Sequence, residues 1–181
     1  DDTATTGIYT LALHDALPIY LLGCTKSQIE ALLIEHGEKP YRATQIMKWL
    51  HHRFVDDFDE MTDISKSFRA TLHELAEIHE PEVVNLKVST DGTRKWLMKS
   101  RSGSSVETVF IPEGARGTLC VSSQVGCILD CKFCSTGKQG FNSNLTAGEI
   151  VGQLRIAQRV LAEVYPDRRR AVTNVVLMGM G

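Results

Sequence analysis

Apolar residues in the first half of the chain recur with the spacing of an α-helix in three separate stretches. The first covers residues 25–37, where a Thr-x-x-Gln sequence has the spacing of a capping box and a glycine supplies the stop. The second covers residues 43–54 and the third residues 61–75, and each places its apolar side chains on one helical face. We therefore expect three short helices that form a small helical domain over residues 21–80.

After residue 80 the pattern changes to that of β-strands. An Asp-Gly pair at residues 91–92 separates two such stretches, and this pair is typical of a tight hairpin turn. A glycine at position 103 marks a further turn before the next stretch. We expect four strands, at residues 84–89, 94–99, 106–111 and 118–122. The first three form a β-hairpin and strand connector over residues 81–117.

The last third of the chain combines a helix with a long apolar run. A Thr-x-x-Glu capping box at Thr146 precedes apolar residues at helical spacing up to Val164. Residues 172–178 are almost continuously apolar, which is typical of a strand buried on both faces in a parallel sheet. With the preceding strand they form one βαβ unit. The fold class is therefore α/β, and residues 118–181 are expected to begin an open or closed α/β barrel.

Composition and charge limit the class of protein further. The chain has 181 residues, 43% hydrophobic and 23% charged, which is typical of a globular protein and not of a disordered or fibrous one. Its net charge of −2 does not favour nucleic-acid binding as a whole, so any basic patch must be local. No apolar run reaches the roughly 20 residues of a membrane helix. A soluble protein is expected.

Both ends of the sequence predict a fragment. The first residue is an aspartate and not a methionine, and residues 1–20 show neither clear periodicity nor capping residues. The last four residues read Met-Gly-Met-Gly and directly follow the apolar run. We therefore expect a foreign leader at residues 1–20 and a longer natural protein that continues after residue 181.

Three of the five cysteines, Cys127, Cys131 and Cys134, have a C-x3-C-x2-C spacing. The odd number and crowded spacing do not suit a secreted disulfide framework, so a reducing cytoplasm is expected. Three thiolates on a four-iron cluster leave one iron open to a small molecule. The alternative is a structural zinc site completed by Cys120 or a histidine, but such sites usually use two separated ligand pairs. The spacing favours an iron–sulfur cluster.

Six stretches of the sequence together match the pattern of one known family. They are YRATQI at 41–46, FDEMT at 58–62, LCVSSQVGC at 119–127, CKFCSTG at 131–137, GFN at 140–142 and NVVLMGMG at 174–181. With these motifs the chain resembles the radical-SAM adenine-C2 methyltransferases of the RlmN type, over about residues 21–181. The resemblance implies that residues 118–181 begin a radical-SAM partial (β/α) barrel and that residues 21–80 help to bind RNA.

The resemblance also implies an enzyme that methylates C2 of adenosine in 23S rRNA and tRNA. It implies a [4Fe-4S] cluster held by Cys127, Cys131 and Cys134, with S-adenosylmethionine (SAM) as the second cofactor. One SAM methylates a cysteine near the family's C-terminus, and a second, cleaved at the cluster, gives the radical that activates this methyl group. An external flavodoxin-like electron donor, a monomeric state and a cytoplasmic location are expected. The fragment alone is expected to be inactive because it lacks the methyl-carrying cysteine.

Three further residues match functional positions of the family. Cys120 matches the cysteine that resolves the protein–RNA adduct, Glu107 the proposed proton acceptor, and Gly181 the start of a SAM-binding turn. Each also has an ordinary structural explanation. Cys120 suits a small buried hydrophobe, Glu107 suits a solubilising charge on an edge strand, and Gly181 suits a turn after a strand.

Two other functions remain open from the residues. One is the related radical-SAM adenine-C8 methyltransferase, and the other is a zinc-stabilised RNA-binding module without catalysis. Residues 135–144 are expected to form a loop that covers the cluster or contacts phosphate. Acidic residues interrupt the basic residues of the helical domain, so a solvated mixed face explains these as well as RNA binding does. The basic residues are Arg42, Lys48, Arg53, Lys66 and Arg69.

Overall fold

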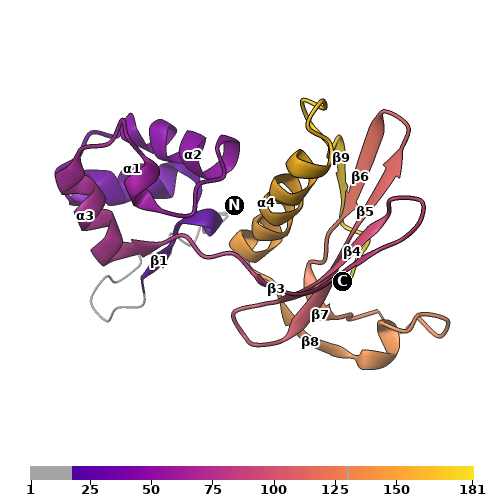
Figure 1. Cartoon of the computed structure of the whole chain (residues 1–181). Coiled ribbons are helices and arrows are strands. Elements are labelled where there is room, and N and C mark those ends of the chain that lie inside the picture. Colours follow the sequence, from indigo (N-terminus) through magenta and orange to yellow (C-terminus); the bar gives the residue numbers. More distant parts are fainter. Residues whose placement is uncertain (1–17, 130) are drawn as a thin grey trace, which may run out of the picture.

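The computed structural model describes residues 18–129 and 131–181, which form a helical part and a sheet part that meet along one long helix (Figure 1). Two short strands of the helical part pair in parallel. Residues 1–17 of the expected leader lie outside the described residues, whereas its last two residues form the first of these strands. The helical part contains β1 (Ile19–Tyr20), η1 (Leu21–Gly23), α1 (Lys26–Glu35), α2 (Arg42–His52), η2 (Phe58–Glu60), α3 (Lys66–Leu75) and β2 (Ala76–Glu77).

The three expected helices are present, and side-chain caps set where two of them begin. Thr25 and Gln28 form the expected capping box at α1, in which each side chain bonds the other residue's N–H. Ser65 accepts a hydrogen bond from the third residue of α3, so this helix begins at Lys66 and not at residue 61 as expected. Met61 and Ile64 are buried in the helical core from the turn before that cap. These two residues are apolar because they are buried, although they do not lie on a helix.

The sheet part is a mixed five-stranded sheet with the strand order β3-β4-β5-β6-β9. Neighbours among the first four strands are antiparallel, and β9 pairs with β6 in parallel. The chain passes from β6 through α4 to β9, so the expected βαβ unit and the α/β class are confirmed. The bounds are β3 (Glu82–Val88), β4 (Arg94–Lys99), β5 (Ser105–Glu113), β6 (Arg116–Cys120), α4 (Ala147–Val164) and β9 (Asn174–Val176).

One face of the sheet is covered by α4 and the other is open (Figure 1). Trp96, Phe110 and Leu119 are completely buried and share a core with Ile156 and Leu161 of α4. Successive residues of a strand point to opposite faces. The residues between these core positions therefore lie on the open face, which carries candidate site residues.

The apolar run at residues 172–178 differs from the expected strand. Only Asn174–Val176 form β9, and Val175, Leu177 and Met178 are 49, 64 and 79% exposed. The expected burial on both faces is therefore wrong for this structure. In the described part of the chain β9 has a neighbour on one edge only, and no helix covers it beyond α4.

A second hairpin was not expected from the sequence. β7 (Gln124–Gly126) pairs with β8 (Phe141–Asn144) in antiparallel orientation, and η3 (Gly137–Gln139) precedes β8. Residues 135–144 are therefore not a plain loop, which corrects that expectation. Both strands are short and polar, so neither shows the apolar alternation that identifies a strand.

The two parts are joined by a buried arginine of α4. Arg155 is 1% exposed, and its guanidinium donates to the carbonyl oxygens of Leu50 and Val55 in the helical part. It also forms an ion pair with Glu80 at 2.6 Å. α4 thus packs in the core of the sheet part and is hydrogen-bonded to the helical part. No helix among the described residues is long and apolar enough to span a membrane.

Candidate active site

The segment that carries Cys127, Cys131 and Cys134, here named the cysteine loop, is held at its base by the β7–β8 hairpin. The N–H of Cys127 donates to the carbonyl oxygen of Gly140 at 3.1 Å. Gly126 has a φ of +74°, and a side chain there would collide with the same carbonyl. The hairpin thus fixes where the first cysteine leaves the sheet.

The end of the cysteine loop is a tight turn. The N–H of Cys134 donates to the carbonyl oxygen of Cys131 at 3.0 Å. Gly137 packs on this turn, where an added Cβ would lie 3.0 Å from the carbonyl oxygen of Leu129. The N–H groups of Gly137 and Thr136 donate to the Cys134 thiol, and these hydrogen bonds lower its pKa. The turn therefore favours the thiolate, which is the form that binds metal.

The three thiols of the loop do not converge on a single point. Among the described residues, Asp57, Asp59 and His73 form a group whose ligand atoms all lie within 4.8 Å of one another, and the cysteines form no such group. A tetrahedral zinc ion holds each sulfur at about 2.3 Å, so its sulfur ligands lie close together. A cluster accepts thiolates that stand further apart, because each binds a different iron. All three cysteines of the loop are free, so their thiols are available to bind a metal group.

Cys120 and Glu107 are neighbours on the open face of the sheet. Val109 of β5 lies opposite Cys120 of β6, which makes Glu107 the diagonal neighbour of the cysteine. The Glu107 carboxylate forms an ion pair with Lys95 of β4 at 2.7 Å. Burial raises the pKa of the Cys120 thiol, although the N–H of Met178 donates to it. This face thus combines a carboxylate held by a cation with a neutral thiol.

Residues 179–181, here named the glycine turn, run beside the chain that enters the cysteine loop. The N–H of Gln124 donates to the carbonyl oxygen of Met180 at 3.0 Å. Gly181 has a φ of +131° and leaves no room for a side chain beside Gln124. The Gln124 side chain in turn accepts from the N–H of Ile128 at 3.1 Å, within the cysteine loop. Gln124 therefore links the glycine turn to the cysteine loop.

The structure adds two residues that the sequence did not single out. Ser122 is bonded both to the glycine turn and to the backbone of Glu107, and Gln153 of α4 is bonded to Ser122. Both side chains are completely buried. The sequence signal that could have revealed Gln153 was a polar glutamine within the apolar stripe of the helix at residues 146–164. Its meaning depends on the sheet that the helix covers, which the stripe does not show.

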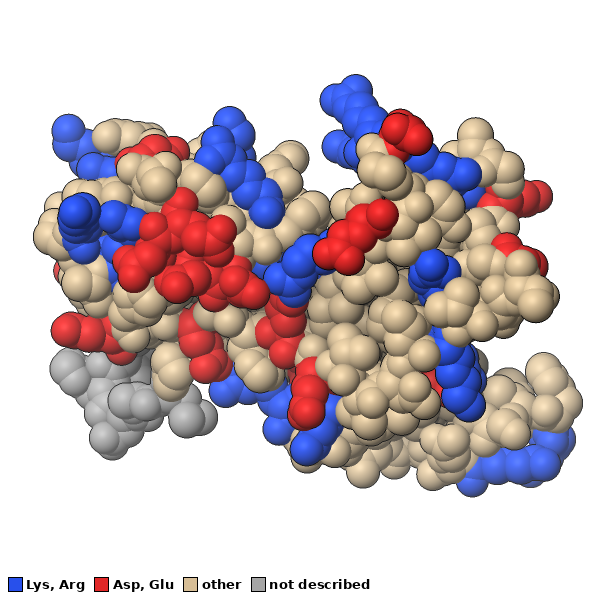
Figure 2. Space-filling view, viewed as in Figure 1, with Lys and Arg blue, Asp and Glu red and all other residues tan. Residues whose placement is uncertain are grey.

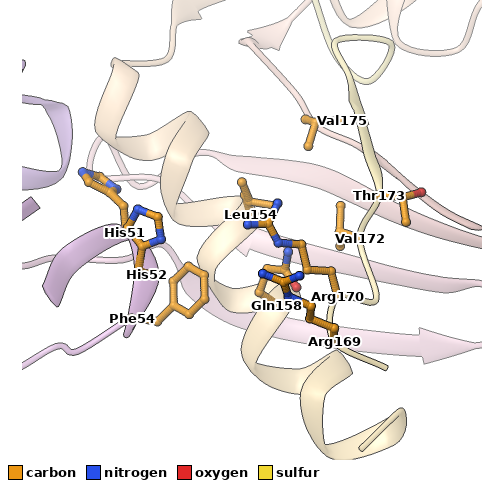
Figure 3. A pocket seen from close by; sticks show the side chains of 10 residues that line it. All are labelled: His51, His52, Phe54, Leu154, Gln158, Arg169, Arg170, Val172, Thr173 and Val175. Atoms are coloured by element: carbon orange, nitrogen blue, oxygen red, sulfur yellow. The ribbon is translucent and has the colours of Figure 1, made fainter. Parts of the chain in front are cut away.

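A separate cavity of about 420 Å³ lies between the end of α2, α4 and the segment before β9. Two histidines and Phe54 at the end of α2 face Arg169 and Arg170 across it (Figure 3). Burial, together with the nearby Arg155 and His52, lowers the pKa of His51. No carboxylate lines the cavity, so its charge suits an anionic group such as phosphate.

The basic side chains of the helical part are partly neutralised by acidic neighbours. Arg42 pairs with Glu38 at 2.8 Å, and Arg69 pairs with Asp59 at 3.8 Å. Figure 2 shows acidic and basic side chains intermingled over this part, with the acidic ones prominent. The face in this view is a mixed, solvated surface and not a basic stripe.

Comparison with known proteins finds relatives of the chain. Residues 19–78 match the model of the ribosomal RNA large subunit methyltransferase N-terminal domain. The chain is 59% identical over 161 residues to the dual-specificity RNA methyltransferase RlmN of Pseudomonas fluorescens (strain SBW25), covering 89% of this chain and 42% of that protein. The chain is related to the RlmN proteins.

Further matches agree with this relationship. The RlmN protein of Marinobacter nauticus is 58% identical over 163 residues, which cover 90% of this chain and 44% of the relative. A crystal structure of a radical SAM methyltransferase from Sphaerobacter thermophilus has a TM-score of 0.81 at 39% identity, covering 91% of this chain and 47% of that one. The chain thus spans less than half the length of these relatives. The resemblance stated from the sequence motifs is confirmed.

Proposed function

We propose that this chain supplies the cluster-binding part of a radical-SAM RNA methyltransferase that methylates C2 of adenosine in 23S rRNA and tRNA. The observation that carries the proposal is the arrangement of the cysteine loop, which the β7–β8 hairpin anchors beside the glycine turn. The similarity to RlmN proteins supports it, whereas no comparison favours an adenine-C8 enzyme or a zinc-stabilised module.

Cys127, Cys131 and Cys134 would hold a [4Fe-4S] cluster. When bound, such a cluster supplies the electron that cleaves SAM and so starts radical chemistry at a carbon that ordinary nucleophilic chemistry does not methylate. The lowered pKa of Cys134 favours the thiolate, which is the form that binds iron. Gly181 provides close backbone approach at the turn that would receive the amino group of SAM.

Glu107 and Cys120 would handle protons and the covalent adduct on the open face of the sheet. The ion pair with Lys95 holds the Glu107 carboxylate on the open face of the sheet. The raised pKa of Cys120 keeps its thiol protonated at neutral pH, so it must lose this proton before it can help to release the protein–RNA adduct. The two groups are close enough in register to exchange that proton through water.

We expect catalytic turnover only from a protein that is as long as these relatives. In that protein the sheet described here would begin a partial (β/α) barrel, with the open face inside it. We place the protein in the cytoplasm as a monomer, with a flavodoxin-like electron donor. The cavity with Arg169 and Arg170 supports RNA as the partner, because guanidinium groups recognise phosphate.

Anaerobic reconstitution of the chain tests the proposal. We expect about four irons per chain, as a [4Fe-4S] cluster requires, and a change in the electron paramagnetic resonance (EPR) spectrum of the reduced cluster when SAM is added. Cys127→Ser, Cys131→Ser and Cys134→Ser should each lose most of the iron, whereas Cys24→Ser in the helical part should retain it. One bound zinc without iron, or a cluster that does not respond to SAM, would overturn the proposal.

The position of methylation is tested with the full-length protein. Mass spectrometry of nucleosides from treated RNA should show 2-methyladenosine in both rRNA and tRNA. If 8-methyladenosine appears and 2-methyladenosine does not, the adenine-C8 activity replaces the one proposed here.

A further inference from the structure

One buried hydroxyl connects two segments of the candidate site. The Oγ of Ser122 donates to the carbonyl oxygen of Glu107 at 2.6 Å and accepts from the N–H of Met180 at 3.0 Å. Ser122 has no exposed surface. Since Met180 is the centre of the glycine turn, this hydroxyl ties the turn to the strand that carries Glu107.

Ser122 is itself held by a buried amide. The Nε2 of Gln153 donates to the carbonyl oxygen of Ser122 at 2.9 Å, and its Oε1 accepts from the N–H of Ser122 at 2.9 Å. The same Oε1 accepts from Thr108 Oγ1 at 2.7 Å, and Nε2 also donates to the Glu149 carbonyl oxygen at 3.3 Å. All four hydrogen-bonding positions of the amide are therefore used. A reversed amide would place donors against donors, so only one orientation fits.

Space around the glycine turn is tight as well. An added Cβ at Gly179 would lie 2.7 Å from Ser122 Oγ and 2.9 Å from the carbonyl oxygen of Val121. The turn therefore lies directly against the serine. A change of the serine side chain must move the turn or leave its N–H at Met180 without a partner.

An apolar residue at position 153 would fill the core between α4 and the sheet without any need for hydrogen bonds. A polar network in this place fixes one arrangement of the backbone, because each buried group must keep its partner. The network reaches three segments of the candidate site: the strand of Glu107, the chain leading into the cysteine loop, and the glycine turn.

We propose that Ser122, locked by Gln153, is a positioning residue that sets the glycine turn for binding the amino and carboxylate groups of SAM. This inference rests on the proposed function for the identity of the ligand. Ser122 does not contact the reacting atoms. It acts through the backbone of Met180 and, by the same hydroxyl, keeps the turn in register with Glu107.

Substitution of the hydroxyl tests the inference in the reconstituted chain. Ser122→Ala should keep its iron and sulfide but bind SAM about tenfold more weakly, the equivalent of one lost hydrogen bond, in an EPR titration. Ser122→Thr would add a methyl group against the tightly packed turn, so Ser122→Ala, which adds no bulk, is the variant that isolates the hydroxyl. Ser105→Ala, an exposed serine at the start of β5, is the matched control and should bind SAM as the wild type does.

A second readout needs neither cluster nor SAM. In the metal-free chain, hydrogen exchange at the Met180 amide, measured by NMR, should be faster in Ser122→Ala than in the wild type. Unchanged exchange together with unchanged SAM affinity would overturn the inference. If the wild-type cluster does not respond to SAM, the proposed function fails, and the exchange rate still decides whether Ser122 holds the turn.

Gln153→Glu tests the lock through pH. The neutral carboxyl still donates one hydrogen bond, but the ionised form presents only acceptors to the carbonyl oxygens of Ser122 and Glu149. Burial raises the pKa of such a group, so Met180 exchange should approach the wild-type rate at low pH and accelerate as pH rises. Amide exchange itself accelerates with pH, and the carboxyls of Glu107 and Glu149 are present in the wild type too, so the ratio of the rates in the two proteins isolates position 153. Gln158→Glu on the same helix should keep the wild-type pH dependence, and a ratio of Gln153→Glu to wild-type rates that does not change with pH would contradict the lock.

Discussion

The surroundings of the cysteines shift their thiol pKa values in opposite directions. Backbone N–H groups lower the pKa of Cys134 at the end of the cysteine loop. Burial raises the pKa of Cys120 on β6, and it also raises the pKa of Cys24 in the helical part. Because the thiolate is the reactive form, these differences must appear as different rates of alkylation.

In the metal-free chain we expect iodoacetamide to modify Cys134 before Cys120. A lowered pKa means that Cys134 is already largely thiolate at a pH where Cys120 is still a thiol. The modification of Cys120 should therefore begin only as pH rises further, within a series from about pH 6 to about pH 9 around the usual thiol pKa. Peptide mass spectrometry after short exposures measures both rates.

Cys24 is the internal reference for this experiment. Its raised pKa has the same main cause as that of Cys120, so it should react late as well. Equal rates at Cys134 and Cys24 throughout the series would show that the N–H groups of the turn do not stabilise the Cys134 thiolate.

At the scale of elements, α4 connects the candidate site to the helical part. Its Gln153 faces the sheet, and Arg155 faces the carbonyl oxygens of Leu50 and Val55. Two residues apart on a helix point to different sides. One helix therefore joins the network at Ser122 to the packing of both parts.

Replacing Arg155 with methionine should destabilise the chain strongly. The substitution leaves two buried carbonyl oxygens of the helical part without their donor and leaves the Glu80 carboxylate with Arg159 alone. Loss of one partner of a buried pair costs about 3–5 kcal/mol. Arg159→Met on the same helix removes ion pairs with Asp56 and Glu80 from a partly exposed side chain and should cost less, about 1 kcal/mol. Urea unfolding followed by circular dichroism measures both, and equal losses would contradict the role given to Arg155.

The sequence allowed accurate prediction where local signals agree with packing. The capping box at Thr146 and the apolar stripe after it located α4 to within one residue of its start. The turn at Asp91 and Gly92 located the β3–β4 hairpin, since Gly92 adopts the positive φ that such a turn needs. β7 and β8 were missed because their pairing depends on contacts across the cysteine loop, not on their own pattern.

At the scale of the whole molecule, the candidate site depends on information of two kinds. The cysteine spacing is local, so the sequence shows it directly. The link from Gln153 to Ser122 joins residues 31 positions apart, and its partner Thr108 lies 45 positions from the glutamine. Such contacts become visible only after the sheet and helix are assembled. The exposed end of the run at residues 172–178 follows from the lack of a second neighbour for β9 among the described residues.

Charge is also a property of the whole molecule. The net charge is −2, so attraction of RNA must come from one region and not from the chain as a whole. Three basic residues of the helical part, Lys26, Arg42 and Arg69, form ion pairs with acidic neighbours. Arg169 and Arg170 form no ion pair within 4.0 Å in the described part of the chain, and they line a cavity without carboxylates.

We therefore expect the double substitution Arg169→Ala and Arg170→Ala to weaken RNA binding. Each phosphate contact contributes roughly 0.7–0.9 to the slope of log affinity against log salt, so loss of two contacts should reduce this slope by up to about 2. Fluorescence anisotropy with an RNA hairpin at several salt concentrations measures both quantities. Arg42→Ala is the matched control and should leave the slope nearly unchanged, because Glu38 already neutralises that guanidinium. If the double variant keeps the wild-type slope, the RNA contact lies elsewhere, because binding with fewer phosphate contacts must release fewer counterions.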